Sequence, residues 1–403
     1  MGVENVVASE YQSAVLRELA NDRFADLDDN FDRLQLGDEP PPPKSVPQEC
    51  WDEARELWQA NDTLAGKLKI ATPLIRAAQF YAAPKAYFQT HASAQIAQGE
   101  YLYGILADER SRELLVKLIA YRILGHRKVK LPRNTKQYWD DIDRAAATRT
   151  NAEPLPINWM DTSLALYDLK PLGYDMTCYA SAAGIACCAV QKQYEYHNGG
   201  IHCKAESGDI AIDAGGCWGD TSLYFAHEVG PSGTVVTFEF TRANLAVLER
   251  NVARNPHLSP RVRLVEHPVW SSSGLKLYSG EWGPASSVMS DEGKYHSREK
   301  EMVGTSWEGG MVESVTIDES VEKLGLPRID FIKMDIEGAE LDALRGGEAS
   351  IRRHRPKMAL SLYHKPEDFE VIPRYLNGLG LNYKFYLDHH TIYQNETVLF
   401  AVP

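Results

Sequence analysis

The sequence predicts an α/β protein in which a largely parallel, doubly wound sheet follows a mainly helical N-terminal region. The segment 208–240 reads as a strand, a glycine-rich turn, a helix and a second strand. From there to the C-terminus, short apolar runs alternate with segments of helical periodicity, and strands separated by helices form parallel sheets. At 403 residues the chain is long enough for two domains.

Residues 1–150 are expected to form the helical region, which could cap a pocket or form a homodimer. Apolar residues recur at helical spacing near the N-terminus, and the acidic, proline-rich segment 37–43 reads as an extended linker. The interval 51–147 is mostly helical, with an interruption over 73–92 where two prolines fall among aromatic residues. One apolar face of its last long helix carries Leu114, Leu115, Leu118 and Tyr121.

Residues 151–403 are expected to form the second domain. It opens with short strands or a hairpin over 155–207, a stretch that contains the small-residue run SAAGIACCAV and the aromatic residues Tyr194 and Tyr196. Together with His197 they could line a substrate pocket, but ordinary sheet packing is the more common role for such a cluster.

The segment 208–240 then sets the pattern of the domain. Ile210–Ile212 is a short apolar strand that ends at Asp213, and a helix over Thr221–Val229 is stopped by a Gly-Pro pair. The next strand ends at Glu239. Between the first strand and the helix lies a glycine turn, where a ligand could approach the backbone, formed by Gly215, Gly216 and Gly219.

This pattern favours an adenosine cofactor without phosphate. Glu239 lies 20 residues after Gly219, where a carboxylate would accept hydrogen bonds from the two hydroxyls of a ribose. The glycine spacing differs from the G-x-G-x-x-G of nicotinamide and flavin enzymes, and Asp213 would repel a pyrophosphate and attract a cation. S-adenosylmethionine fits both departures. The alternative is a tight connection in some other α/β protein.

The remaining elements continue the alternation. Residues 268–312 form a long insertion with three tryptophans, which is typical of a lid, although a part of it such as LKLYSGEW could form a β-hairpin. We expect helices at 242–255 and from 340 to about 353, and a third helix that follows the strand at 357–363 and ends at about 379. Strands are expected at 261–267, 329–334, 357–363, 383–387 and 397–402.

Polar residues at the carboxyl ends of these strands are the candidates for chemistry, because ligands bind at that edge of an open sheet. Val269 would contact the adenine. His364 and Asp335 are the candidate catalytic residues: the histidine as a base for a hydroxyl nucleophile, the aspartate to orient it or, with Glu337, to hold magnesium or manganese. Alternatively, the histidine only starts a helix, and the carboxylates favour a helix N-terminus.

Two blocks, IDAGGCWGDTSLYFA followed by FEF, and IDFIKMDIEGAELDALRGG followed by LSLYHKPEDFEVIP, resemble the FkbM-type methyltransferases over about residues 160–403. The resemblance implies a class I Rossmann-like methyltransferase fold, with a mostly parallel seven-stranded sheet and an antiparallel final strand. It also implies S-adenosylmethionine as methyl donor and O-methylation of a sugar or secondary metabolite, as in natural product biosynthesis. The residues expected at the cofactor are Asp213, Gly215, Gly216, Trp218, Gly219, Asp220, Thr221, Glu239 and Val269.

Composition limits the partners. The net charge of −13 argues against nucleic-acid and anionic-membrane surfaces, and no apolar run approaches the length of a membrane span. The N-terminus lacks a signal sequence, so we expect a cytoplasmic protein with a small-molecule or glycan hydroxyl acceptor. The six cysteines show no zinc spacing. A non-catalytic S-adenosylmethionine-binding scaffold, an N-methyltransferase and a nicotinamide oxidoreductase remain as alternatives.

Overall fold

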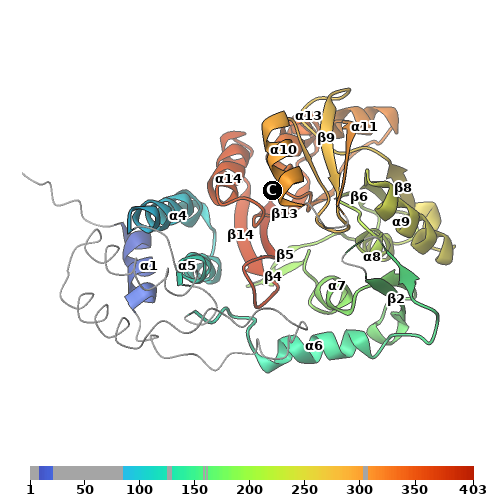
Figure 1. Ribbon diagram of the computed structural model, residues 1–403, viewed down its shortest axis with the longest axis horizontal. Helices are drawn as coiled ribbons and strands as arrows, with labels where there is room; N and C mark the ends of the chain where they lie inside the picture. The colour runs from blue at the N-terminus through green and yellow to red at the C-terminus, as the bar shows by residue number, and fades with distance from the viewer. Residues whose placement is uncertain (1–8, 21–84, 125–128, 158, 160–161, 303–306) are drawn as a thin grey trace, which may run out of the picture. The chain divides into compact units, whose positions relative to one another are not determined.

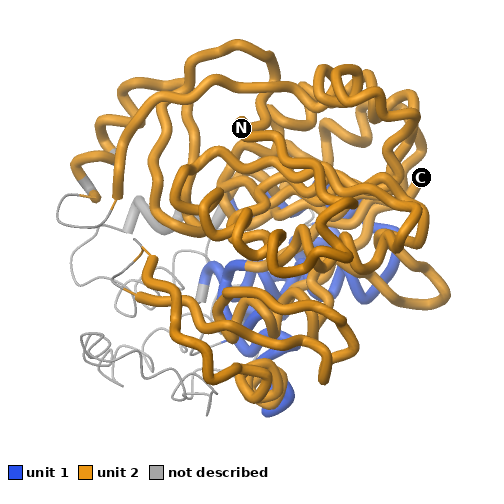
Figure 2. Tube along the Cα trace, turned by 90° about the vertical axis from the view of Figure 1, so that its right-hand side faces the viewer, with its two compact units in different colours: residues 1–138, 391–395 blue, residues 139–390, 396–403 orange. Residues whose placement is uncertain are grey.

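The structure is a computed structural model that describes residues 9–20, 85–124, 129–157, 159, 162–302 and 307–403 (Figure 1). The chain divides into two compact units, coloured blue and orange in Figure 2: Met1–Tyr138 with Thr391–Asn395, and Trp139–His390 with Glu396–Pro403. The predicted linker at 37–43 and the helical prediction for 51–84 lie outside the described residues.

The first unit is helical where it is described. Its helices are α1 (Glu10–Ala20), α4 (Lys85–Ile105) and α5 (Glu109–Leu124), and α6 (Lys136–Ala146) crosses the boundary into the second unit. The predicted interruption up to residue 92 is wrong over 85–92, because Pro84 precedes the helix and leaves its hydrogen bonds intact. All four residues of the predicted apolar face on α5 are buried: Leu114, Leu115, Leu118 and Tyr121.

The second unit begins with small antiparallel sheets. β1 (Leu155–Pro156), β2 (Ser163–Asp168) and β3 (Thr177–Ala180) form one sheet, and the hairpin of β4 (Tyr196–Asn198) and β5 (Ile201–Cys203) forms another.

The small-residue run between these sheets is helical, which corrects the expectation of strands there. It forms α7 (Ala182–Ile185) and a π-helical turn over Ala186–Val190. The Ser181 hydroxyl caps α7 by accepting a hydrogen bond from the Gly184 amide at 3.0 Å. A short apolar run has no periodicity that distinguishes a buried strand from a buried helix. The serine at the start of the run, a common helix N-cap, was the feature that indicated a helix.

The main sheet has seven strands and confirms the predicted fold. β15 pairs antiparallel with both β13 and β14, whereas β13, β12, β6, β7 and β8 are mutually parallel. The order across the sheet is β14 (Lys384–His389), β15 (Thr397–Val402), β13 (Lys357–Ser361), β12 (Phe331–Met334), β6 (Ile210–Ala214), β7 (Thr234–Phe238) and β8 (Val262–Val265).

Helices connect the parallel strands. A large apolar cluster joins α8, the sheet and the segment 165–205, with the rings of Phe225 and Phe331 5.5 Å apart. No helix in the described part of the chain is both long and apolar enough to cross a membrane. The helices of this unit after α7 are α8 (Asp220–Glu228), α9 (Arg242–Arg254), α10 (Glu292–Glu301), α11 (Ile317–Lys323), α12 (Glu340–Arg345), α13 (Glu348–His354) and α14 (Asp368–Gly378).

The predicted insertion contains a small sheet of its own. β9 (Lys276–Glu281) lies between β10 (Ser287–Met289) and β11 (Glu308–Glu313), antiparallel to both. The two ends of the insertion are held together, because the Trp270 amide donates to the Val315 carbonyl at 2.9 Å and the Val315 amide donates to the Pro268 carbonyl at 3.0 Å.

The glycine turn lies where the strand order reverses, between β6 and its neighbour β12. Gly215 has a φ of +89°, and a Cβ added to it would lie 1.9 Å from the carbonyl oxygen of Asp335. A side chain at Gly216 would meet the Thr237 methyl group at 2.3 Å. The turn therefore needs glycine for close approach to β12 and β7 as well as for backbone conformation.

Replacing Gly215 and Gly173 by alanine should distinguish the cost of a positive φ from the cost of the clash with the end of β12. Gly173 has a φ of +99° but no described atom within 4 Å of an added Cβ, so Gly173→Ala measures the backbone cost alone, about 1–3 kcal/mol. Gly215→Ala should lower the free energy of unfolding by a further ~1–3 kcal/mol because of the clash. Urea titration of both variants tests this, and equal losses would show that contact with β12 does not constrain the turn.

Candidate functional site

A cleft opens at the carboxyl ends of β6, β7 and β12, at the reversal of strand order, where open α/β sheets bind ligands. Its empty space, counted to the open mouth, is about 490 Å³. Four segments border it: the glycine turn, the segment after β7, the insertion with the residues just before it, and the loop after β12. The lining residues are Gly215, Cys217, Phe238, Glu239, Phe240, Asn244, His267, Pro268, Val269, Pro284, Ser286, Val288, Asp335, Ile336, Glu337 and Ala339.

Glu239 lies in this cleft with one carboxylate oxygen committed to the backbone. Its Oε1 accepts hydrogen bonds from the amides of Phe240 and Thr241 at 2.7 and 2.9 Å, which fixes the side chain at the end of β7. Its Oε2 has a long contact of 3.4 Å with the Asn244 side-chain amide. Burial raises the pKa of Glu239 despite these hydrogen bonds. The Oε2 oxygen can therefore accept from a ligand hydroxyl.

Asp213 is not among the residues that line the cleft, and its contact with a cationic cofactor stays a prediction. The side chain is fully buried, and its Oδ1 lies 3.1 Å from Nζ of Lys333, which is also buried. Its Oδ2 accepts hydrogen bonds from the hydroxyls of Thr221 and Ser222 at 2.9 and 2.7 Å. A carboxylate with these partners is neutralised within the protein, so Asp213 holds the turn in place.

Lys333 is the cation that the sequence analysis missed. Burial acts to lower the pKa of Lys333, but the charges of Asp213 and Asp335 outweigh it and raise the pKa. The ammonium donates to the carbonyl oxygens of Ala214 and Gly215 at 3.1 and 2.6 Å, and so ties β12 to the glycine turn. The sequence does contain a pattern that could have predicted this ion pair: a lysine within one apolar strand and an aspartate within another.

The other predicted turn residues lie outside the cleft lining. Trp218 packs edge-on against Trp159, at 5.9 Å between ring centroids, in a separate cavity beside α9. Gly219 is the N-cap residue of α8, and Asp220 and Thr221 lie in the first turn of that helix. Cofactor contact stays a prediction for all the residues named for it, of which Gly215, Glu239 and Val269 line the cleft.

Asp335 follows β12 and is held by two phenols. Its Oδ2 accepts from the Tyr194 hydroxyl and its Oδ1 from the Tyr363 hydroxyl, each at 2.9 Å. Burial acts to raise the pKa of Asp335, but His364 and Lys333 outweigh it and hold the pKa well below the ordinary value. Asp335 is therefore a carboxylate at neutral pH, with its oxygens in fixed positions at the cleft.

The residues after Asp335 form a loop that places Glu337, like Asp335, at the cleft. Glu337 has a φ of +54°, a left-handed conformation that is uncommon for a residue with a side chain. The loop is held by Glu340, which accepts hydrogen bonds from the amides of Ile336 and Gly338 at 3.0 and 3.4 Å, and by Lys365, which donates to the Gly338 carbonyl. Such strain persists where the surrounding structure fixes it, as it commonly does at functional sites.

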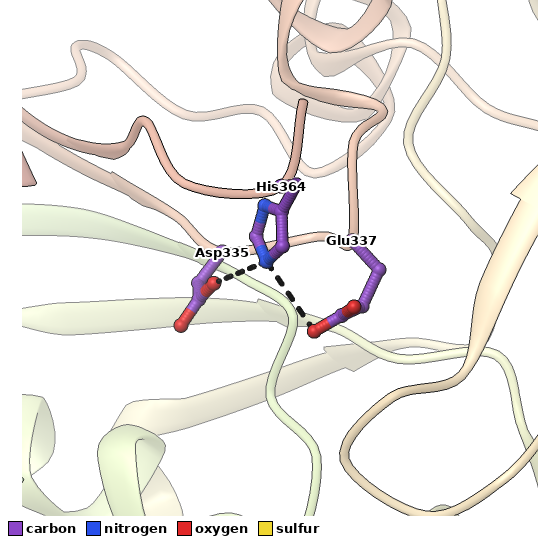
Figure 3. Close-up of side chains that lie close together, drawn as sticks. All are labelled: Asp335, Glu337 and His364. Atoms are coloured by element: carbon purple, nitrogen blue, oxygen red, sulfur yellow. Dashed lines mark ion pairs between the residues drawn. The ribbon is translucent and has the colours of Figure 1, made fainter. Parts of the chain in front are cut away.

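His364 meets these carboxylates from the segment after β13 (Figure 3). Its Nε2 lies 3.3 Å from an oxygen of Asp335 and 3.3 Å from an oxygen of Glu337, and its Nδ1 lies 2.9 Å from Glu340. Burial acts to lower the pKa of His364, but the three carboxylates raise it well above the usual value. An imidazolium cannot accept a proton, so these surroundings disfavour the predicted role of His364 as a base at neutral pH.

Further residues near this cluster were not among the predicted site residues. Tyr363 and Tyr194 donate to Asp335, and Glu396 lies close enough to Asp335 for their charges to interact. Burial, with Asp335, raises the pKa of Glu396 to about 7. Cys217 lines the cleft, but burial raises its pKa well above the ordinary value, so the thiol stays protonated.

The family comparison bears on this same region. Residues 202–385, which contain the glycine turn, Glu239, the 335–340 loop and His364, match the family model described as Methyltransferase FkbM domain. The chain contains an FkbM methyltransferase domain. This confirms the resemblance at the level of the domain.

Proteins similar to this chain include a methyltransferase from Sordaria araneosa, sdnD, which is 30% identical over 159 residues, or 35% of this chain and 61% of that protein. The solved structure of methyltransferase FkbM from Methylobacillus flagellatus is 17% identical, with a TM-score of 0.47, over 79% of this chain and 60% of that one. The chain thus spans less than two thirds of the length of either relative.

The buried Asp213–Lys333 pair should be essential to the stability of the FkbM domain. Lys333→Met leaves a buried carboxylate without its cation and should lower the free energy of unfolding by ~3–5 kcal/mol. Adding Asp213→Asn removes the orphaned charge, so the double variant should be less destabilised than the sum of the single variants. Urea titration measures all three.

The matched control is Lys323→Met, which breaks the exposed pair between Lys323 and Glu319 on α11. Exposed ion pairs contribute little, so this variant should remain close to wild type in urea. Strictly additive losses at Asp213 and Lys333 would contradict the coupling.

Proposed function

We propose that this protein is an S-adenosylmethionine-dependent O-methyltransferase acting on a hydroxyl of a sugar or secondary metabolite. One observation carries the proposal: a single cleft in an FkbM domain is lined by Glu239 and also by Asp335 and Glu337. The first suits the ribose of the donor, and the second pair suits the reacting end of an acceptor.

The donor would lie across the reversal of strand order. Glu239 Oε2 accepts hydrogen bonds from the ribose hydroxyls, and Pro268 and Val269 contact the adenine. The methionine end extends past Gly215 toward Asp335. No side chain stands at Gly215, because an added Cβ would collide with the backbone at the end of β12. The backbone there is therefore open to the approach of a ligand.

Methyl transfer places few demands on acid chemistry and many on position. The acceptor oxygen attacks the methyl carbon in line with the S–C bond, and that bond breaks with its electron pair retained by sulfur. The hydroxyl proton passes to His364 as base. Alternatively, Asp335 and Glu337 would hold a magnesium or manganese ion, which would supply Lewis-acid chemistry that makes loss of the proton to water easier. The three carboxylates around His364 favour the second route.

The acceptor is proposed to be a small molecule or glycan, and the N-terminal helical region is proposed to cap the pocket or form a homodimer. The net charge of −13 supports an acceptor other than nucleic acid.

Calorimetric titration with S-adenosylmethionine, S-adenosylhomocysteine and NAD tests the donor. We expect micromolar binding of the two sulfur ligands and none of NAD. Glu239→Gln replaces an acceptor oxygen by an amide donor, so it should weaken binding of both sulfur ligands roughly 10-fold to 150-fold, about 1.5–3 kcal/mol.

The control for this experiment is Glu249→Gln, an exposed position on α9, which should bind as wild type does. A folded protein that binds neither sulfur ligand would contradict the proposal and favour a scaffold. Unchanged affinity in Glu239→Gln would remove Glu239 from the donor site. Binding without transfer to any hydroxylated acceptor would exclude catalysis of O-methylation.

A further inference from the structure

We propose that Asp335, Glu337 and His364 together bind one divalent transition-metal ion, with Nε2 of His364 as its nitrogen ligand. Use of the ion in methyl transfer rests on the proposed function, whereas binding of the ion does not. The inference goes beyond a cation held by carboxylates alone, because the histidine becomes a ligand and thereby selects the kind of ion.

The distances suit a metal ion. One ligand atom from each of the three residues can be chosen so that all lie within 4.8 Å of one another, and Nε2 is 3.3 Å from an oxygen of each carboxylate. Ligands at about 2.0–2.2 Å from a common ion are separated by roughly 3.0–3.5 Å in tetrahedral or neighbouring octahedral positions. Both Nε2–oxygen separations already fall in that range.

The histidine distinguishes this cluster from an ordinary group of acidic residues. The His364 side chain is only 6% exposed, yet among the described residues neither ring nitrogen has a hydrogen-bond partner of ordinary geometry. Figure 3 shows Nε2 directed between the oxygens of Asp335 and Glu337. A buried polar atom normally has a directional partner, and a metal ion at this point would supply one.

The surrounding residues would orient the ligands. With Nε2 on the metal, the other ring nitrogen, Nδ1, would lie 2.9 Å from an oxygen of Glu340, and a carboxylate beside the second nitrogen is typical of metal-bound histidines. Glu340 is itself fixed by the amides of Ile336 and Gly338. Tyr194 and Tyr363 hold Asp335, one on each oxygen. The ligands therefore come from two segments, each secured by its own contacts.

The ligand set indicates a transition metal over magnesium. Mg²⁺ prefers six oxygen ligands and retains its waters, whereas imidazole nitrogen binds ions such as Mn²⁺, Fe²⁺ and Zn²⁺ more readily. Three protein ligands leave coordination positions open. An acceptor hydroxyl that binds there loses its proton to water more easily, and its oxygen remains free to attack the methyl carbon of the donor.

The test is titration of the purified full chain, freed of metal by chelator, with Mn²⁺ followed by electron paramagnetic resonance, in the absence of donor and acceptor. We expect one Mn²⁺ to bind per chain. The affinity for Mn²⁺ should be at least tenfold higher than the affinity for Mg²⁺ measured by competition. His364→Gln and Glu337→Gln should each weaken Mn²⁺ binding about 100-fold or more, and Glu340→Gln, which changes the residue behind the ligand, about 10-fold to 100-fold.

The matched control is His296→Gln on α10. His296 also lies near two carboxylates, Glu292 and Glu299, at 3.7 and 3.0 Å, but its side chain is half-exposed. This variant should retain wild-type Mn²⁺ affinity.

Titration of the same samples with S-adenosylmethionine separates the two proposals. Donor binding without Mn²⁺ binding, or undiminished Mn²⁺ affinity in His364→Gln, would overturn the metal site and leave the proposed function standing. Mn²⁺ binding that His364→Gln abolishes, in a protein that does not bind the donor, would support the site and contradict the function. Full methyl transfer in the presence of chelator would show that the ion takes no part in the reaction.

Discussion

The ion pair between Asp213 and Lys333 holds together the two strands between which the strand order reverses. The two residues belong to adjacent parallel strands, β6 and β12, and are paired in register within the sheet. Burial of both charges is tolerated because each has further partners: two hydroxyls for the carboxylate and two backbone carbonyls for the ammonium. The pair therefore positions the turn after β6 relative to the end of β12.

The same lysine connects the turn to the acidic cluster. Its ammonium lies 5.4 Å from the centre of the Tyr194 ring, and the hydroxyl of that ring donates to Asp335. The two sides of the cleft thus share one buried network. A change in the position of Lys333 would alter the path available to a ligand past Gly215 and, through Tyr194, the orientation of Asp335.

The sequence was sufficient for the sheet and for much of the cleft border. Strand ends and glycines are local signals, so they located Glu239, Asp335 and Glu337, and the family resemblance supplied the seven-stranded sheet with its antiparallel final strand. The partners of charged groups were harder to predict. Asp213 looked available because its cation lies 120 residues later in an apolar strand, and His364 looked like a free base because its three carboxylates were not assigned to one point. Such pairings depend on tertiary proximity, which spacing along the chain does not encode.

The insertion after β8 has a feature that bears on how this protein could diversify. Its ends are joined at Pro268, Trp270 and Val315, so the sheet receives the chain back at the point where it left. Yet residues well inside the insertion, Pro284, Ser286 and Val288, line the cleft. For a loop closed at its base, doubling the length costs only about 0.6 kcal/mol. Changes in the length or sequence of the insertion can therefore alter this border of the cleft while the main sheet keeps its strand pairing.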